Sequence, residues 1–270
     1  MLTLLLGLAC QRPVALPPPP SPPAAEVLWA RRDDPAALQE ALSLYARAAE
    51  NDPSSRWLQL RLTRGWVFQA TYHSSPDASE AAWESALRWG ESCLALNTEY
   101  SALRQKERES EQSATRSLTA ADVPCAYWMA LAWDGWLSHQ GTSTRLLARD
   151  TSPAYIERVS ALEPTYHYSA VARYWGSHYA QLPPFAGRDL AQSRQHFTQA
   201  RTDSPGFLTA DVDMARHWAV TAGDQETFVA LLEGVLAADP DTTPDVLPEN
   251  RAARSLAQQL LARQDDLFPR

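Results

Sequence analysis

The sequence contains very little lysine, few glycines and few cysteines. Lys106 is the only lysine, and just 10 glycines are spread over 270 residues. Arginine supplies the remaining basic side chains, but acidic residues outnumber them and the formal net charge is −8. Proteins that bind a phosphate backbone need a basic surface, so this charge balance argues against nucleic acid as a partner.

The short motifs that mark common active sites are also missing from the chain. It has no glycine-rich phosphate loop, no HExxH or GxSxG motif and no CxxC pair. His167 and His178 fall on one side of a helix, but they lie about three turns apart, which is too far for one metal ion. Cys93 and Cys125 fall on apolar helical faces, where a cysteine is usually a small buried hydrophobe. We therefore predict no enzymatic activity, no metal site and no cofactor.

The N-terminus reads MLTLLLGLACQRPVALPPPPSPP, and its apolar run is too short to span a bilayer. The run has the length of a signal peptide core and resembles a bacterial lipoprotein signal that ends before Cys10. We expect a signal peptide over residues 1–9, then a lipidated Cys10 and a proline-rich tether over residues 10–33, since consecutive prolines favour an extended chain. An ordinary short leader is the alternative, because Gly7 stands where leucine is usual and no basic residue precedes the run.

Residues 34–270 show the periodicity of helices and few signals of strands. Apolar positions recur every three or four residues, and one such face is formed by Leu38, Ala41, Leu42, Tyr45, Ala48 and Ala49. The pattern predicts an all-α domain of about ten or eleven helices.

Five stretches carry the spacing of the second helix of a tetratricopeptide (TPR) repeat, in which small residues allow close packing and a proline follows the helix. The full matches are Ala41, Tyr45, Ala48 and Pro53, and Ser193, Phe197, Ala200 and Pro205. Looser matches end at Thr98, Pro164 and Pro240. Because their spacing is irregular, we predict a TPR-like solenoid of helical hairpins with degenerate repeats.

The stretch from Val123 to Gly141 is apolar nearly all round when placed on a helix, so we expect it at the centre of the domain. Asp134 is its polar exception, and it shares one stripe with Tyr127 and Ser138. A buried carboxylate needs a partner or water. Asp134 therefore either bonds to a neighbouring helix or lines a cavity.

The stretch YWGSHYAQLPPFAGRDLAQSRQHF, residues 174–197, joins two predicted helices. Pro183 and Pro184 end the first helix, and Gly187 gives the turn conformational freedom. Asp189 is the expected N-cap of the second helix, with Gln192 completing a capping box. Tyr174 and His178 lie beside the apolar face of the first helix, where they either belong to the core or border a ligand cleft.

Several stretches together resemble the TRAP-transporter T-component family (TatT-like). The resemblance is carried by LEPTYHYSAVARYWGSHYAQLPPFAGRDLAQSRQHFTQA, DVPCAYWMALAWDGWLSHQ, FVALLEGVLAADPD and LPENRAARSLAQQLLARQDDLF. It covers roughly Pro35 to Phe268 and is strongest from Asp122 onward. Arg188 departs from the family pattern, which usually has a second glycine there.

The resemblance implies a non-enzymatic periplasmic lipoprotein that serves a tripartite ATP-independent periplasmic transporter. It implies docking of the solute-binding P-component, a homotrimer, and a cleft or pore for a small hydrophobic ligand. The residues that we expect to line this cavity are Tyr127, Trp133, Asp134, Trp136, Tyr174, Trp175 and His178. The alternative function is a TPR-like protein–protein scaffold of the cell envelope that transports no ligand.

Overall fold

The computed structural model describes residues 22–106 and 111–269, and these residues form an all-α fold with no strand among them. The predicted all-α class is confirmed, and the TPR-like solenoid stays a prediction. The long helices are α2 (Pro35–Asn51), α3 (Arg56–Phe68), α4 (Glu80–Ala95), α7 (Val123–Leu137), α9 (Thr151–Leu162), α10 (Tyr166–Gln181), α11 (Leu190–Asp203), α14 (Gln225–Ala237) and α15 (Leu247–Ala262). The short ones are α1 (Pro23–Trp29), α5 (Thr98–Arg104), α6 (Glu111–Thr115), α8 (Thr142–Leu147), α12 (Thr209–Asp213), α13 (Val220–Ala222) and α16 (Gln264–Leu267).

Turns divide the chain more finely than the sequence pattern indicates. Sixteen α-helical segments occur in the described ranges, compared with the expected ten or eleven, and nine of them have 12 residues or more. Two π-helical turns interrupt the α-helices, η1 (Gln69–His73) after α3 and η5 (Met214–Ala219) between α12 and α13.

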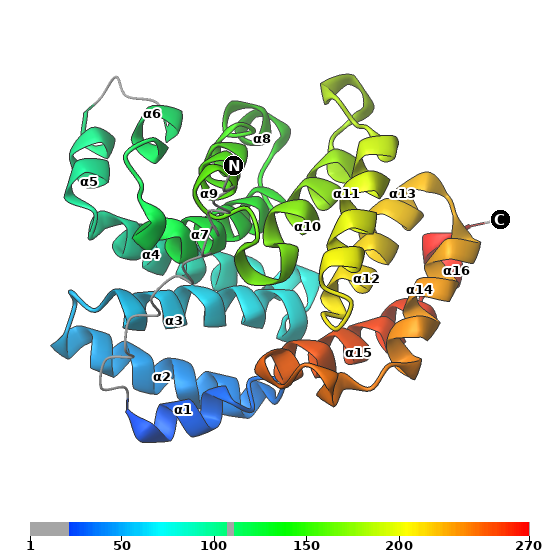
Figure 1. Ribbon diagram of the computed structural model, residues 1–270, viewed down its shortest axis with the longest axis horizontal. Helices are drawn as coiled ribbons and strands as arrows, with labels where there is room; N and C mark the ends of the chain where they lie inside the picture. Colours follow the sequence, from blue (N-terminus) through cyan, green and yellow to red (C-terminus); the bar gives the residue numbers. More distant parts are fainter. Residues whose placement is uncertain (1–21, 107–110, 270) are drawn as a thin grey trace, which may run out of the picture.

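Helices that follow one another along the chain pack side by side, as Figure 1 shows. The closest pair is α10 with α11, because Gly176 lets the ring of Phe197 lie against the backbone of α10. A Cβ atom at residue 176 would come within 2.8 Å of that ring. Ser193 adds a hydrogen bond of 2.6 Å from its hydroxyl to the Gly176 carbonyl.

Residues of the repeat pattern lie in the helices where the spacing places them. In α2 both Ala41 and Tyr45 are fully buried, and α11 buries Phe197 and Ala200 in the same way. Both helices end just before the proline of the pattern, at Asn51 and Asp203. Small and aromatic residues at this spacing therefore form the contact face of each helix.

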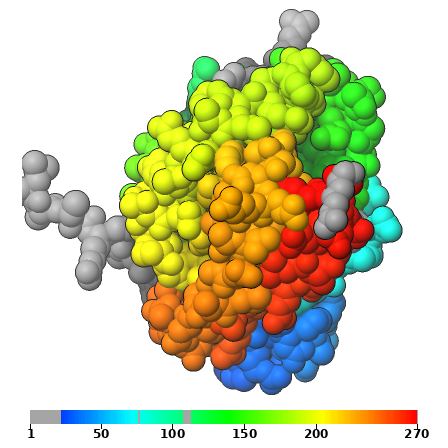
Figure 2. All heavy atoms as spheres, turned by 90° about the vertical axis from the view of Figure 1, so that its right-hand side faces the viewer, coloured from blue at the N-terminus to red at the C-terminus, as the bar shows by residue number. Residues whose placement is uncertain are grey.

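The two ends of the described chain contact each other. Ala252 of α15 belongs to the same apolar cluster as Trp29 and Leu38 near the N-terminus. Figure 2 shows the orange and red C-terminal helices directly against the blue N-terminal helices. The row of helices thus closes on itself, and α7 and α10 lie above this contact in the view of Figure 1.

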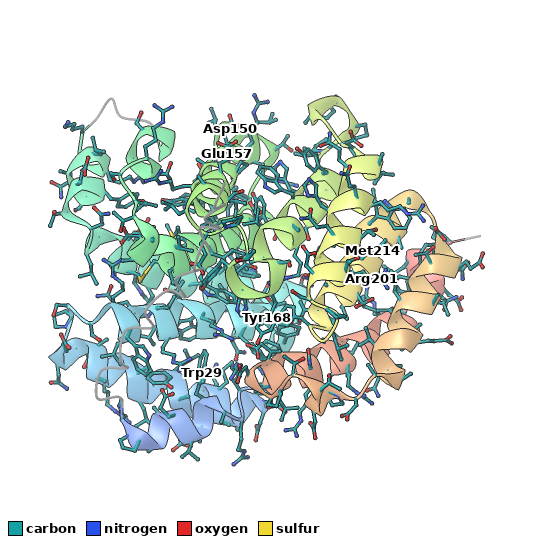
Figure 3. All side chains as sticks on the ribbon, in the orientation of Figure 1. Trp29, Asp150, Glu157, Tyr168, Arg201 and Met214 are labelled. Carbon is teal, nitrogen blue, oxygen red and sulfur yellow. A yellow bond between two sulfur atoms is a disulfide. The ribbon has the colours of Figure 1, made fainter. Side chains whose placement is uncertain are left out.

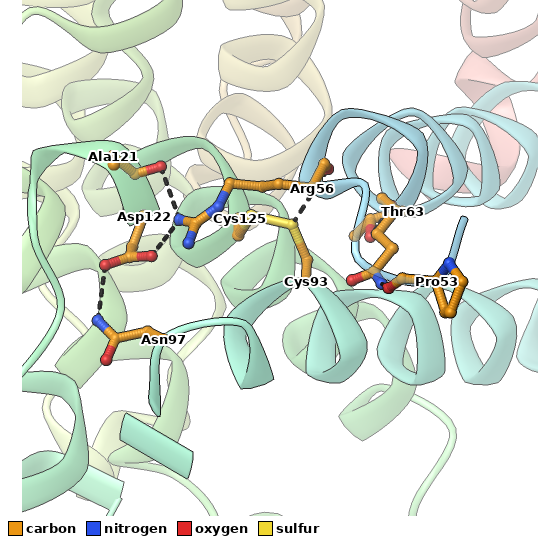
Figure 4. Close-up of a disulfide and its surroundings, with 9 residues drawn as sticks. Pro53, Arg56, Thr63, Cys93, Asn97, Ala121, Asp122 and Cys125 are labelled. Carbon is orange, nitrogen blue, oxygen red and sulfur yellow. Dashed lines mark hydrogen bonds and ion pairs between the residues drawn. A yellow bond between two sulfur atoms is a disulfide. The ribbon is translucent and has the colours of Figure 1, made fainter. Parts of the chain in front are cut away.

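Helix α7 is the most apolar segment of the fold and lies in its largest core cluster, as expected. Cys125 on α7 forms a disulfide with Cys93 on α4, with an S–S distance of 2.00 Å (Figure 4). The prediction that these cysteines are separate small hydrophobes is therefore wrong. Both are buried, but the packing of α4 on α7 brings their Cα atoms to 5.9 Å, a spacing that allows a disulfide.

The folded chain begins earlier than residue 34. Helix α1 lies within the stretch 10–33 that we expected to be a tether, and it buries Ala25 and Trp29 against α2 and α3. The predicted signal peptide and Cys10 lie outside the described residues. In the ranges that the structure describes, no helix is long and apolar enough to cross a membrane.

Candidate functional site

A cavity of about 580 Å³ lies between the central helices and the two ends of the chain. Its wall takes residues from α3 and η1, from α7 and α10, and from α12, η5 and α15. Because α15 returns to the N-terminal helices, the cavity is bordered by segments that are far apart in the sequence. In volume it lies within the range typical of small-molecule sites.

One stripe of α7 and one stripe of α10 form facing walls of the cavity. On α7 the stripe contains Tyr127, Leu131, Asp134 and Ser138, which recur every three or four residues. Helix α10 contributes Arg173, Tyr174, Ser177 and Gln181 at similar spacing. Of the seven expected cavity residues, Tyr127, Asp134 and Tyr174 lie in this wall.

The other four expected residues, Trp133, Trp136, Trp175 and His178, are not part of the wall. Trp133 and Trp175 pack against the core cluster around α7. Trp136 contacts Trp133 edge to face, and His178 stacks on Tyr174 with ring centres 5.7 Å apart. Of these four, Trp175 and His178 contact the wall residue Tyr174.

Both π-helical turns of the fold border the cavity. Ala70, Thr71 and Tyr72 come from η1, and Arg216 and His217 come from η5. A π turn inserts an extra residue into a helix and often occurs at a functional site. The Tyr72 hydroxyl lies 3.2 Å from the Thr209 hydroxyl, which links η1 to α12 across the wall.

The first turn of α10 is left-handed. His167, Tyr168 and Ser169 have φ values of 44°, 54° and 57°, a region that L-residues avoid at a cost of about 1–2 kcal/mol each. Arg173 holds this turn by donating hydrogen bonds of 3.0 Å to the His167 carbonyl and 3.2 Å to the Tyr168 carbonyl. In Figure 3, Tyr168 lies near the middle of the molecule, and its ring stacks on Phe207 at 5.0 Å.

Glu249 of α15 is a fully paired carboxylate in the wall. Its oxygens accept hydrogen bonds from Arg32, on the turn after α1, and from Arg64 of α3, the latter at 2.6 Å. Burial alone would raise the pKa of Glu249, but Arg64 and Arg32 lower it below its usual range. Glu249 therefore stays ionised and joins the two ends of the chain.

Asp134 differs from Glu249, because its pKa is raised rather than lowered. No basic side chain pairs with it within the described part of the chain, and burial raises its pKa to about 6. The hydroxyls of Ser152 and Tyr174 lie close enough to lower this pKa in part, although neither hydroxyl forms a hydrogen bond of ordinary geometry. Asp134 therefore lines the cavity, and it also lies close to side chains of the neighbouring helices α9 and α10.

Two histidines of the wall are neutral at physiological pH. Burial lowers the pKa of His167 well below its usual value, and Arg64 and Arg173 lower it further. Burial, helped by Arg216, has the same effect on the pKa of His217. In the described residues no group of three or more histidine, cysteine or acidic side chains could hold a metal ion.

The joint between α10 and α11 lies outside the cavity wall. Gly187 has a φ of 104°, and Asp189 caps α11 by accepting hydrogen bonds from the amides of Ala191 and Gln192 at 3.0 and 2.9 Å. The expected capping box differs in detail. The Gln192 side chain donates to the Asp189 carboxylate, because the Asp189 amide already donates to the Tyr179 carbonyl.

Sequence reasoning missed several residues of the wall. Arg173 and Glu249 were not singled out, although a charged residue inside an apolar helical stripe is a signal that could have identified Arg173. Glu249 had no such signal, because its partners Arg32 and Arg64 lie about two hundred residues away.

A family model described as TRAP transporter T-component matches residues 79–268. No curated protein matches the chain. The matched part runs from the start of α4 to the end of α16, and thus includes α7, α10 and α15. Residues 22–73 precede the matched part. They include Arg32, Arg64 and the η1 residues of the cavity wall.

Proposed function

The chain belongs to the TRAP transporter T-component family, and on this premise we propose that it is a non-enzymatic periplasmic accessory component of such a transporter. In this role it docks the solute-binding P-component and holds a small hydrophobic ligand in the central cavity. The observation that carries the proposal is the cavity itself, which has an aromatic wall and lies where the ends of the chain meet.

The composition of the wall supports binding of an organic molecule. Tyr127, Trp128, Tyr174 and Phe207 supply aromatic surface, and a few polar groups lie among them. Apolar pockets with a small number of placed polar groups are typical ligand sites. A scaffold protein needs no such space in its interior, where side chains otherwise pack closely.

An oxidising compartment is supported by the buried disulfide between Cys93 and Cys125. Disulfides persist in the periplasm and are rare in the cytosol, where thiols are kept reduced. Export by the leader and lipidation of Cys10 would place the domain in this compartment and hold it at a membrane. The variant Cys10→Ala tests the anchor: the protein should leave the membrane fraction, and unchanged membrane association would contradict lipidation.

Exposed apolar side chains are candidates for the docking contact. Phe185, in the joint between α10 and α11, is 80% exposed, which is unusual for a phenylalanine. We expect Phe185→Ser to weaken binding of the P-component without lowering the melting temperature. Val27→Ser is the matched control, because Val27 is also exposed but belongs to α1, which Figure 1 shows far from the joint between α10 and α11.

The decisive experiment captures candidate solute-binding proteins on the immobilised mature domain and identifies co-purified small molecules by mass spectrometry. Recovery of both a solute-binding protein and an organic ligand is the expected result. Recovery of a protein partner with no ligand would favour the scaffold function, and recovery of neither would overturn the proposal. Light scattering on the same sample tests the homotrimer.

A further inference from the structure

We propose that Arg173 forms an anion-binding subsite in the cavity, which takes the carboxylate of an amphiphilic organic acid whose apolar body lies along the aromatic wall. The inference rests on the ligand-binding part of the proposed function and specifies the chemistry of the ligand.

Arg173 is a buried cation that lacks an acidic partner. Its side chain is 6% exposed and lines the cavity, and no described carboxylate forms an ion pair with it. Its guanidinium donates hydrogen bonds to two backbone carbonyls, through Nε and Nη2, and it lies close enough to the neutral Tyr127 hydroxyl to lower the pKa of that tyrosine in part. A buried charge is costly unless it is paired, so this guanidinium is prepared for an anion that the chain itself does not supply.

Two acids of the cavity wall already have arginine partners. Asp213 pairs with Arg216 at 2.8 Å, and Glu249 is shared by Arg32 and Arg64. Both acids thus already have arginine partners, and Arg173 is left without an acidic partner among these side chains. One unpaired guanidinium matches the single charge of one carboxylate.

The charged groups that act on His167 are also all basic. Besides burial, the influences on the pKa of His167 come from Arg64, Arg173 and Arg32, and all three lower it. No acid opposes them among these influences. His167 is therefore neutral. Of the three arginines that act on it, Arg32 and Arg64 pair with Glu249, whereas Arg173 has no acidic partner.

The backbone positions Arg173 at the expense of local strain. The carbonyls that orient its guanidinium belong to His167 and Tyr168, two residues of the left-handed turn. Strained backbone of this kind persists where the surrounding structure holds it, and it concentrates at ligand sites. The ring of Phe207 lies 4.5 Å below the guanidinium carbon and limits its movement further.

Aromatic surface begins directly beside the cation. Tyr127, Trp128 and Phe207 line the same part of the cavity, so a molecule that places its charged end at Arg173 buries its apolar part against them. Arginine is well suited to such a place because its guanidinium binds carboxylates by charge-assisted hydrogen bonds and stacks on rings.

The test compares octanoate with 1-octanol, which has the same chain length but no charge, by titration calorimetry on the mature protein at neutral pH. We expect the wild type to bind octanoate about tenfold more tightly than octanol, since charge-assisted hydrogen bonds are the stronger kind. The preference should vanish in Arg173→Met and persist in part in Arg173→Lys. Arg158→Met is the control, because Arg158 is half-buried and likewise donates to a backbone carbonyl, at 2.9 Å, but lies outside the cavity wall.

Each result decides between the two proposals. Equal binding of octanoate and octanol by the wild type, or a preference that survives in Arg173→Met, would overturn the anion subsite while leaving ligand binding intact. Binding of neither compound would overturn both the subsite and the ligand-binding part of the proposed function. The comparison within the wild type decides the question even where a variant does not fold.

Discussion

Two carboxylates in the wall of the same cavity, Glu249 and Asp134, differ in their partners and in their pKa. Glu249 is held by two arginines, and its pKa is lowered. Asp134 has only hydroxyl neighbours, and burial raises its pKa to about 6. The difference shows that a buried charge can serve as a joint between helices when it is paired, whereas an unpaired one remains available to the cavity.

The paired carboxylate closes the fold. Arg32 and Glu249 are 217 residues apart in the sequence, and their ion pair lies where the N-terminal helices meet α15. Asp134, in contrast, lies in the last turn of α7, a helix that packs in the largest core cluster. The loss of each carboxylate should therefore have a different effect.

The largest effect is expected from Glu249→Gln. Removing this charge leaves Arg32 and Arg64 buried without an anion, which should lower the free energy of unfolding by about 3–5 kcal/mol. Chemical denaturation at neutral pH measures the change. A loss below about 1 kcal/mol would show that the cluster is not what holds the two ends together.

A smaller and pH-dependent effect of the opposite sign is expected from Asp134→Asn. The folded pKa of about 6 exceeds the ordinary value of 3.8, so the wild type loses stability as pH rises from about 4 and the loss is complete above about pH 6. Asparagine removes this loss, and the variant should be more stable than the wild type by roughly 3 kcal/mol at neutral pH.

Thermal unfolding of the Asp134→Asn variant and the wild type at a series of pH values tests this prediction. The two stability curves should converge near pH 4 and separate above it. Parallel curves across that range would mean that Asp134 has an ordinary pKa and that its surroundings are well hydrated.

The smallest effect is expected from Arg251→Ala. Arg251 of α15 pairs with Asp33 across the same junction as Glu249, but it is half-exposed and the two charged atoms are 3.9 Å apart. Exposed ion pairs contribute little, so the free energy of unfolding should change by less than about 0.5 kcal/mol. A loss near that of Glu249→Gln would mean that burial is not what distinguishes the two pairs.

Much of the fold follows from local pattern. The periodicity of Leu38, Ala41 and Tyr45 predicts α2, because helical spacing and a following proline are local properties. The apolar stretch from Val123 predicts a central buried helix for the same reason. The stripe of Tyr127, Asp134 and Ser138 was also visible before the structure, and all three residues lie in the cavity wall.

Other parts depend on which helices meet. The sequence contains no sign that Cys93 faces Cys125, since each alone looks like an ordinary apolar residue of its helix. Arg173 lies beside Tyr174 in the sequence, yet its proposed role depends on the left-handed turn and on Phe207, which lies in the turn between α11 and α12. Four of the seven expected cavity residues lie outside the wall. A wide apolar helical face does not indicate which of its edges borders the cavity.

The sequence by itself determined the helical class, the central position of α7 and the end of α2 before Pro53, because periodicity, hydrophobicity and proline act over a few residues. Tertiary structure alone decided that α15 returns to α1 and α3, and so decided where the cavity lies and which charges face it. Contacts between residues two hundred positions apart depend on the summed angles of every intervening helix pair. Small deviations at each pair accumulate, and no short segment encodes the result.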